Sequence, residues 1–470
     1  MNVQYISYIK EKLKDSFDVK YRELECPKGI ITIIYIDNLC DSKFISEYVI
    51  QPLLSREDLK DIDSIKKEIL WANVVGKVND EQDAITHILS GDVVLVLNFD
   101  KNVLYCEAKG FAKRPVFIPP TEAVIKGPRE GFNEAIMDNI SLIRRKIKNK
   151  DLKFESFNVG EKSKTTVVVS YMKETAHNDL VQYIRDKIKN MKIDFVLDTN
   201  YIEEQLKNTR SPFDTVGYTE KPDIVASKLF EGKVIVMVDG SSSVIIAPYF
   251  FIENLQAPDD YYLNKYFTSF ARLQRWIALF IAMLLPGLYI ALSTYHFSLV
   301  PTVLVFRLAN SRAGVPFPTI VEVVIMILFF QILREAGIRL PQPTGQALSI
   351  VGALILGEAA IGAGLTSETT IVIVAISSIS TFLVPNLYKA VVIWGLIILL
   401  FSSLLGLPGF YLGFFSLIAH LASLNSCGYP YLYPVGTKSN NTNGDLLIRR
   451  RLSKISNNTF DEDEKNEKNS

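Results

Sequence analysis

One stretch of this chain limits what it can fold into: the 48 residues Ala390–Thr437 contain no Asp, Glu, Lys or Arg. Elsewhere charge is plentiful, with 51 basic and 51 acidic residues that are closely spaced before residue 272. A soluble surface needs charged residues, whereas a bilayer core takes about 20 apolar residues per helix. The uneven spread predicts a soluble amino-terminal part and a membrane-embedded carboxy-terminal part. The overall balance of charge gives no reason to expect nucleic acid as a partner.

The membrane domain is expected at residues 272–425. Five or six helices both remain open, as does a re-entrant hairpin, because the last two apolar segments are short for a bilayer. The apolar segments are 276–295, 315–333, 346–366, 369–387, 390–405 and 410–424. With six crossings, most Lys and Arg of the short loops fall on the side of the amino terminus. This asymmetry predicts that the soluble domain is cytoplasmic.

The soluble part shows one pattern twice. Strand-like runs at 30–36 and 91–97 match runs at 165–171 and 232–238, and Gly91 and Gly232 are 141 positions apart. We therefore expect two related α/β (or α+β) subdomains, followed by an all-α polytopic membrane domain. The expected boundaries are 1–125 for the first subdomain, 126–255 for a linker helix and the second, and 438–470 for a polar, disordered tail.

Between the subdomains, residues 126–132 read KGPREGF and precede a helix at about 133–148. Backbone N–H groups there, together with Arg129, could hold an anion. A turn that joins the two subdomains is the simpler interpretation. The basic run that follows (Arg144, Arg145, Lys146, Lys148 and Lys150) is predicted to be a solvated helix end, with a contact to a partner or a lipid head group as the alternative.

No motif in the sequence indicates an enzyme. The chain contains no P-loop, no G-x-S-x-G and no H-E-x-x-H, and its four cysteines are far apart. We therefore expect no catalytic residue, no cofactor and no metal site.

Glu358 is the notable charge, because it interrupts an apolar segment where a carboxylate costs about 2.5–3.5 kcal/mol. Small residues surround it at spacings of four, which lets helices approach closely. The next segment carries Thr370, Ser377 and Thr381 on nearly one helical face. These groups either line a water-filled ion path or form a packed interface in which Glu358 pairs with a residue such as Arg312 or Arg334.

Two sets of candidate residues follow. The pore or gating candidates are Glu358, Gly357, Gly362, Gly364, Thr370, Ser377, Thr381 and Glu322. Glu322 is expected near a membrane edge with a structural role. The candidates for contacts with other subunits or at the membrane interface are Arg129, Arg334, Glu335 and Arg339.

Several long strings resemble the spore germination receptor A-subunit family. The strongest are 316–341 (PFPTIVEVVIMILFFQILREAGIRLP) and 343–358 (PTGQALSIVGALILGE). Further matches lie at 126–145 (KGPREGFNEAIMDNISLIRR), 219–223 (TEKPD), 237–240 (MVDG), 259–262 (DDYY) and 424–434 (LNSCGYPYLYP). The stage V sporulation branch of similar architecture stays open.

The resemblance implies a protein of the endospore inner membrane, with its amino-terminal domain on the spore-core side. It implies a transporter-like B subunit and a lipoprotein C subunit as partners, besides membrane lipid. It also implies a homo-oligomer, expected to be a ring, that forms a germinant-gated cation channel and triggers germination. The alternative is a non-conducting scaffold that docks the B and C subunits. A secondary transporter is less favoured, since the membrane part shows no inverted repeat.

Overall fold

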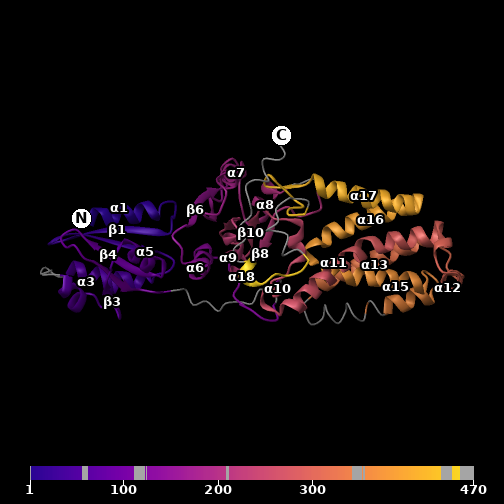
Figure 1. The fold of residues 1–470 in the computed structure, drawn as a ribbon, viewed down its shortest axis with the longest axis horizontal. Helices are drawn as coiled ribbons and strands as arrows, with labels where there is room; N and C mark the ends of the chain where they lie inside the picture. The colour runs from indigo at the N-terminus through magenta and orange to yellow at the C-terminus, as the bar shows by residue number, and fades with distance from the viewer. Residues whose placement is uncertain are drawn as a thin grey trace.

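The computed structural model describes residues 2–55, 62–110, 122, 124–207, 211–340, 352, 355–435 and 447–455. They form an elongated molecule with three parts in a row (Figure 1). The first α/β unit (residues 2–110) lies at one end, the second α/β unit (residues 124–255) in the middle, and the bundle (residues 265–423) at the other end. This arrangement confirms the prediction of a mixed α/β region with two sheets followed by a helical region. The predicted domain boundaries stay predictions.

The first unit is built on a five-stranded antiparallel sheet with the order β1-β2-β4-β5-β3. Its strands are β1 (Val19–Cys26), β2 (Gly29–Ile36), β3 (Val75–Lys77), β4 (Asp92–Leu97) and β5 (Val103–Glu107). Helices pack on both faces, so β2 and β4 are apolar on both sides. Ile34 and Val94 face one helix layer, while Ile31 and Leu95 face the other.

The helices of the first unit form two layers. One layer contains α1 (Asn2–Lys12) and α5 (Glu81–Leu89). The other contains α2 (Ser42–Phe44), η1 (Ile45–Ile50), α3 (Gln51–Ser55), α4 (Ile62–Ser64) and η2 (Ile65–Ile69). Burial on both faces explains why short runs of β-branched residues form these strands.

The second unit repeats the same design. Its sheet order is β6-β7-β9-β10-β8, which matches the first sheet strand for strand. The strands are β6 (Leu152–Val159), β7 (Thr165–Met172), β8 (Gly217–Thr219), β9 (Val234–Val238) and β10 (Val244–Ala247). Helices α6 (Ile136–Lys146) and α9 (Pro222–Phe230) cover one face, and α7 (Asn178–Lys189) and α8 (Asn200–Leu206) cover the other. The recurrence in the sequence thus corresponds to a repeated sheet topology.

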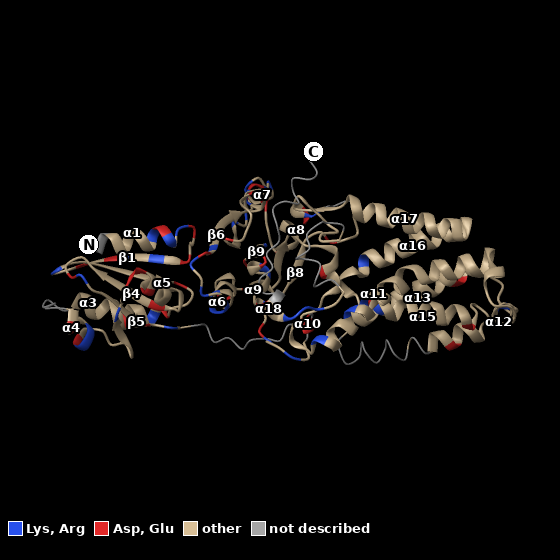
Figure 2. Ribbon diagram, in the orientation of Figure 1, with Lys and Arg blue, Asp and Glu red and all other residues tan. Residues whose placement is uncertain are grey.

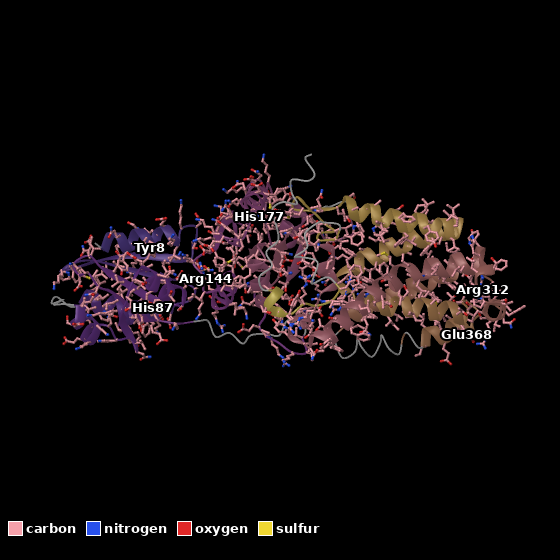
Figure 3. The ribbon with its side chains drawn as sticks, in the orientation of Figure 1. Tyr8, His87, Arg144, His177, Arg312 and Glu368 are labelled. Carbon is pink, nitrogen blue, oxygen red and sulfur yellow. The ribbon has the colours of Figure 1, made fainter. Side chains whose placement is uncertain are left out.

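A buried ion pair joins the two α/β units. The Arg144 guanidinium in α6 donates from Nε to Asp18 Oδ2 at 3.0 Å and from Nη2 to Asp18 Oδ1 at 3.1 Å. Both side chains are fully buried, and Figure 3 places Arg144 between the units. The expectation of a solvated face is therefore wrong for Arg144. The helix end that carries it is covered by the first unit, and sequence spacing cannot reveal this.

The second unit also buries a cluster of charges. Glu253 accepts hydrogen bonds from Lys228 Nζ at 2.6 Å and from Lys233 Nζ at 2.5 Å. Burial raises the pKa of the Glu253 carboxyl, but the two lysines outweigh burial and lower the pKa to about 2. Glu253 therefore stays ionised and is a carboxylate partner for both lysines, while Lys228 also pairs with Glu231.

The bundle contains the apolar helices. They are α11 (Lys265–Ile290) with η4 (Ala291–Tyr295), α12 (Thr302–Arg312), α13 (Thr319–Arg339), α15 (Glu368–Thr381), α16 (Tyr388–Leu405) and α17 (Leu407–Ser423). Helix α11 packs on α15 and α16, α13 packs on α15, and α17 packs on α16. By length and composition, residues 265–295 and 385–405 are able to cross a membrane, and α15 and α17 are shorter apolar helices. The count of five or six crossings stays a prediction.

Short elements connect the bundle to the second unit. They are η3 (Phe251–Leu255), α10 (Asp259–Tyr262), η6 (Pro385–Leu387) and the hairpin of β11 (Asn425–Ser426) and β12 (Tyr429–Pro430), whereas η5 (Phe297–Leu299) joins η4 to α12 within the bundle. In α10, Asp260 accepts hydrogen bonds from Arg272 Nε at 2.8 Å and from Arg275 Nη2 at 2.5 Å. Burial raises the pKa of Asp260, but Arg275 and Arg272 outweigh it and hold the pKa below its usual range.

The hairpin returns the chain to the second unit after the last bundle helix. Ser426 Oγ donates to the carbonyl of Thr215 at 2.5 Å and accepts from the backbone N–H of Tyr249 at 2.8 Å. The Tyr431 hydroxyl donates to the carbonyl of Asp214 at 3.0 Å. The second unit therefore contacts both the first and the last long helix of the bundle.

Part of the predicted tail also has a defined place. Residues 447–455, which include α18 (Leu452–Ile455), belong to the described chain. Arg449 is buried and donates from Nη1 to the carbonyl of Leu263 at 2.8 Å. This piece packs against the start of α11, while residues 438–446 and 456–470 lie outside the described residues.

Candidate functional site

The best-defined polar site of the bundle surrounds Glu322, in the first turn of α13. Its side chain is fully buried. Arg312 Nε donates to Glu322 Oε1 at 3.3 Å. Glu322 Oε2 accepts from the backbone N–H of Ser367 at 3.0 Å, from Thr370 Oγ1 at 3.1 Å and from Thr366 Oγ1 at 3.5 Å. Four donors thus compensate the removal of this carboxylate from water.

Local helix ends explain why the carboxylate lies there. Helix α12 ends at Arg312, and α15 begins after the N-cap residue Ser367, whose side chain accepts from the N–H of Thr370. The amino terminus of a helix carries partial positive charge and stabilises an anion. Arg312 and Glu368, the first residue of α15, are labelled near the outer end of the bundle, away from the α/β units (Figure 3). Glu322 therefore ties α12, α13 and α15 together at that end.

The three predicted hydroxyls all lie inside the protomer. Thr370 also contacts the hydroxyl of Tyr289 in α11 at 3.2 Å, and Ser377 Oγ donates to the carbonyl of Ala282 at 2.8 Å. Thr381 Oγ1 accepts from Arg334 Nη1 at 3.0 Å. All three are buried, so in a single protomer they join α15 to α11 and α13.

Glu358 lies differently from these buried groups. In the helical segment 355–362, Leu356 and Ala360 pack against α13 and α15. The Glu358 side chain is exposed on the opposite side, and no hydrogen bond or ion pair joins it to another described residue. Arg312 and Arg334, the two basic partners considered for it, contact Glu322 and Thr381 instead. The protomer therefore exposes a carboxylate on an otherwise apolar helix.

Small residues flank Glu358 on its exposed side. Ala359, Gly362 and Ala363 are exposed, and a Cβ atom added at Gly362 would meet nothing within 4 Å. We call these three residues and Glu358 the Glu358 face. Its lack of bulk would let the backbone of another helix approach closely.

The two other glycine candidates have local roles. Gly357 faces α15, where an added Cβ would lie 4.0 Å from Ile371. Gly364 has a φ of +66°, and its N–H donates to the carbonyl of Ile361 at 2.9 Å. Such a left-handed residue commonly ends a helix. The first part of the predicted segment 346–366 (residues 346–351, 353 and 354) lies outside the described residues.

The candidate contact residues do not form one site. Glu335 and Arg339 make an exposed ion pair at 2.6 Å. Arg129 is exposed in the segment that links the two α/β units, before α6. The N–H of Ile136, at the start of α6, already donates to Asp239 Oδ1 at 3.2 Å, so this helix start has an anionic partner within the chain.

Arg334 differs from its neighbours because it points into the bundle. Besides its bond to Thr381, its guanidinium lies 3.4 Å from the ring centroid of Tyr388 and 5.1 Å from that of Phe382. Its place at the end of a helix suggested an interface residue, and only the packing of α16 reveals the aromatic contacts. Within the described ranges, no group of three His, Cys, Asp or Glu side chains could hold a metal ion.

Comparisons with known proteins agree on one family. The model of the family described as Bacillus/Clostridium GerA spore germination protein matches residues 7–459. The chain is 35% identical over 438 residues to the uncharacterized membrane protein YfkQ of Bacillus subtilis (strain 168), covering 92% of this chain and 85% of that protein. It is 33% identical over 453 residues to spore germination protein KA of the same organism, covering 94% and 83%.

One solved structure is also similar. It is the crystal structure of the N-terminal domain of the A subunit of the Bacillus megaterium spore germinant receptor GerK3. The sequence identity is 30%, the TM-score is 0.41, and the match covers 52% of this chain and 94% of that chain.

Proposed function

The chain belongs to the Bacillus/Clostridium GerA spore germination protein family, and we propose that it is the A subunit of a nutrient-germinant receptor in the spore inner membrane. In this proposal, several copies assemble into a ring and form a germinant-gated channel. Its opening lets cations leave the spore core and starts germination.

The Glu358 face carries the proposal. A carboxylate that faces lipid costs about 2.5–3.5 kcal/mol or more. Glu358 has no partner among the described residues, and residues 340–388 contain no Lys or Arg in the sequence. In a ring, water or a neighbouring copy faces this carboxylate, and the small residues beside it allow the close approach. A line of such carboxylates around a pore attracts cations.

The bundle surface supports a place in the membrane. Many large apolar side chains are exposed on it, among them Ile277, Phe280, Leu328, Ile376, Leu400 and Phe415. Exposed apolar surface of this extent favours contact with lipid. Figure 2 shows Lys and Arg where the bundle meets the α/β region, and few charges further along the bundle. By the distribution of basic residues, the α/β units then lie on the spore-core side.

Partners follow from the same proposal. Curated relatives are named spore germination proteins. We propose that the chain acts with a transporter-like B subunit, which senses the nutrient, and with a lipoprotein C subunit. Besides the ring of its own copies, lipid is the remaining partner, and no enzymatic activity is proposed.

Disulfide cross-linking tests the assembly. Gly362→Cys introduces a thiol on the Glu358 face, where the added side chain has open space. The native cysteines are buried and make a low background. We expect oxidation in membranes to give cross-linked oligomers of Gly362→Cys, and Leu400→Cys, exposed on α16, to serve as the matched control. If Leu400→Cys forms cross-linked oligomers to the same extent as Gly362→Cys, the Glu358 face is not a subunit contact or pore.

Ion flux tests the channel itself. Liposomes that hold the chain with its B and C subunits are loaded with K⁺, and each nutrient class is added in turn. We expect nutrient-triggered K⁺ release that falls in Glu358→Gln and stays unchanged in Glu368→Gln, an exposed carboxylate at the start of α15. Nutrient binding without release from any liposome would favour the non-conducting scaffold.

A further inference from the structure

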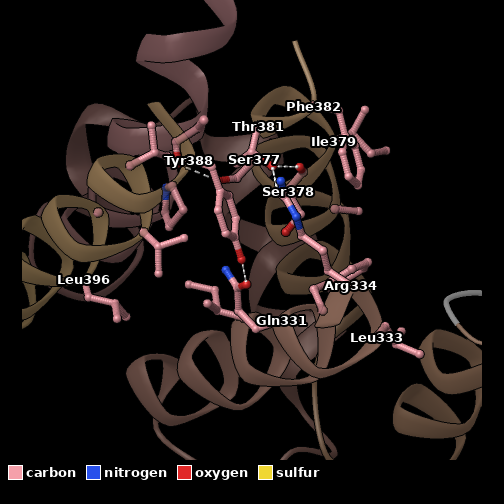
Figure 4. Close-up of a pocket in the computed structure, with 18 of the residues that line it drawn as sticks. Gln331, Leu333, Arg334, Ser377, Ser378, Ile379, Thr381, Phe382, Tyr388 and Leu396 are labelled. Atoms are coloured by element: carbon pink, nitrogen blue, oxygen red, sulfur yellow. Dashed lines mark hydrogen bonds between the residues drawn. The ribbon is translucent and has the colours of Figure 1, made fainter. Parts of the chain in front are cut away.

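A cavity inside the bundle has a charged end and an apolar end. Its volume is about 710 Å³, and it is walled by α11, α13, α15 and α16 (Figure 4). This volume is within the range of small-molecule sites, roughly 300–1,000 Å³. We propose that the cavity binds an acyl lipid with an anionic head group, whose head contacts Arg334 and whose chain fills the apolar part.

The charged end lies next to the α/β units. Arg334, Thr381 and Tyr388 meet there, with Gln331 accepting a hydrogen bond from the Tyr388 hydroxyl (Figure 4). The residue after Tyr388 is Lys389, whose Nζ lies 3.3 Å from Asp214 of the second α/β unit. The polar groups of the cavity are thus at the end of the bundle where a membrane would meet water.

The apolar end lies deeper in the bundle. Ile327 is seven residues before Arg334, about 10 Å along α13 at 1.5 Å per residue. Pro286, Ile371 and Leu396 complete this part of the wall. The cavity therefore runs from a polar end near the α/β units to an apolar end, in the direction that a membrane lipid takes.

Charge indicates which head group would bind. Arg334 makes no ion pair with a described carboxylate, because Glu335 pairs with Arg339 and Glu322 pairs with Arg312. The sequence contains no Asp or Glu between Glu335 and Glu358. A guanidinium binds phosphate and carboxylate oxygens through paired hydrogen bonds. An anionic head group supplies the partner that the chain does not.

The side of the cavity gives an entry route. Ile338, Ile379 and Phe382 line it and are exposed on the bundle surface. A lipid could enter from the surrounding bilayer between α13 and α15 without unfolding the bundle. The stacking of Arg334 on Tyr388 holds the guanidinium at the cavity wall, which lowers the entropy lost on binding.

Spin-labelled lipids test the proposal with the full chain. The protein is placed in phosphatidylcholine nanodiscs that contain a trace of phosphatidylglycerol or phosphatidylcholine with a spin label on the acyl chain. We expect a motionally restricted spectral component that favours phosphatidylglycerol over phosphatidylcholine by about five-fold, the effect of one basic residue on an anionic lipid. Equal restriction of the two lipids in the wild-type chain would overturn the proposal.

Variants locate the site. Arg334→Gln should remove the preference for phosphatidylglycerol, while Arg339→Gln, on the same helix but exposed, should keep it. Ala375→Phe, which fills the cavity from α15, should reduce the restricted component of both lipids. A preference that persists in Arg334→Gln would place the lipid elsewhere. If Arg334→Gln does not fold, Arg334→Lys, which keeps the charge, should retain part of the preference, and full loss there contradicts a head-group contact.

A second copy of the chain is the competing occupant. Its insertion into the cavity would remove the restricted component on oligomerisation, whereas a bound lipid would co-purify with the oligomer. Native mass spectrometry of the oligomer in phosphatidylglycerol micelles separates these outcomes. An oligomer whose measured mass equals that of the protein chains alone, with no bound phosphatidylglycerol, would contradict the proposal.

Discussion

The α/β region and the bundle treat their buried charges in opposite ways. In the α/β region Asp18 pairs with Arg144, and Glu253 pairs with two lysines, so each of these charges has its partner in the chain. In the bundle Glu322 has such partners. Among the described residues, Glu358 is exposed without one, and Arg334 has a hydroxyl and aromatic rings but no carboxylate as partners.

This difference suggests which parts are complete in a single protomer. The buried ion pairs of the α/β region lie within that region, although Cys427, Tyr429 and Tyr433 of the hairpin complete one core of the second unit. Among its described residues, the bundle leaves two charges without an oppositely charged partner, and our proposals assign these to a second copy and to a lipid. In a single protomer in water, the bundle would then be less stable than the α/β region. Each prediction below tests this contrast, starting with the largest expected effect.

Removing Glu253 should cause the largest loss of stability. Glu253→Ala leaves Lys233 buried without a counter-charge and Lys228 with Glu231 as its remaining carboxylate, which costs about 3–5 kcal/mol. The loss of stability is measured by chemical unfolding of the full chain in detergent, with a spectroscopic signal from the α/β region as the readout. Glu231→Ala, which removes a more exposed carboxylate beside Lys228, is the matched control and should cost far less. Equal losses would mean that the buried cluster is not held by Glu253.

Acid should remove the same interaction. The pKa of Glu253 is lowered to about 2 from 4.5, so its stabilising effect is complete above about pH 4.5. The effect decreases as the pH falls and is lost as the pH passes through about 2, for a total on the order of 3 kcal/mol. Unfolding measured from pH 6 to pH 2 should show this slope in the wild-type chain and a smaller slope in Glu253→Gln. Identical slopes would assign the acid effect to other carboxylates.

Neutralising Glu322 should have an intermediate effect. Glu322→Gln keeps the shape but leaves Arg312 without its carboxylate and weakens the bonds to α15, a loss of about 1–3 kcal/mol. The melting temperature of the bundle in detergent reports it. Glu335→Gln, in the same helix but exposed, should change stability by less than about 1 kcal/mol. If Glu322→Gln leaves the melting temperature unchanged, the expected difference in stability between the Glu322 and Glu358 variants does not exist.

Neutralising Glu358 should have the smallest effect on stability. The side chain is exposed, so Glu358→Gln should stay within about 0.5 kcal/mol of the wild-type protomer in detergent. Melting curves recorded beside those of Glu322→Gln make the comparison direct. A loss as large as that of Glu322→Gln would mean that Glu358 has a structural partner within the chain, which would weaken the pore proposal.

The sequence predicts the α/β region well where apolar runs are long. Strands β2, β4, β7 and β9 lie close to the predicted runs, because helices on both faces make these strands apolar throughout. The edge strands β1 and β6 were not predicted. The exposed positions of β1 carry Lys, Arg and Glu, and those of β6 carry Ser and Asn, so both strands lack the continuous apolar signal.

The candidate site was predicted only in part. The sequence singles out Glu322, Glu358 and the hydroxyls of α15, because polar groups are rare in apolar segments. It cannot tell which side of a helix faces another helix. Glu322 is the fully buried carboxylate and Glu358 the exposed one, and this depends on how α12 and α15 pack around α13. Long-range contacts such as Ser367 with Glu322 leave no local trace.

The hairpin of β11 and β12 has a mechanical consequence. Hydrogen bonds join the second α/β unit to the bundle. Arg275 of α11 donates to the carbonyl of Leu255, and Ser426, just after α17, donates to the carbonyl of Thr215. If the second unit tilts relative to the bundle, both of these contacts must change. A rotation of the second unit relative to the bundle would therefore change contacts next to the first and the last long helices together.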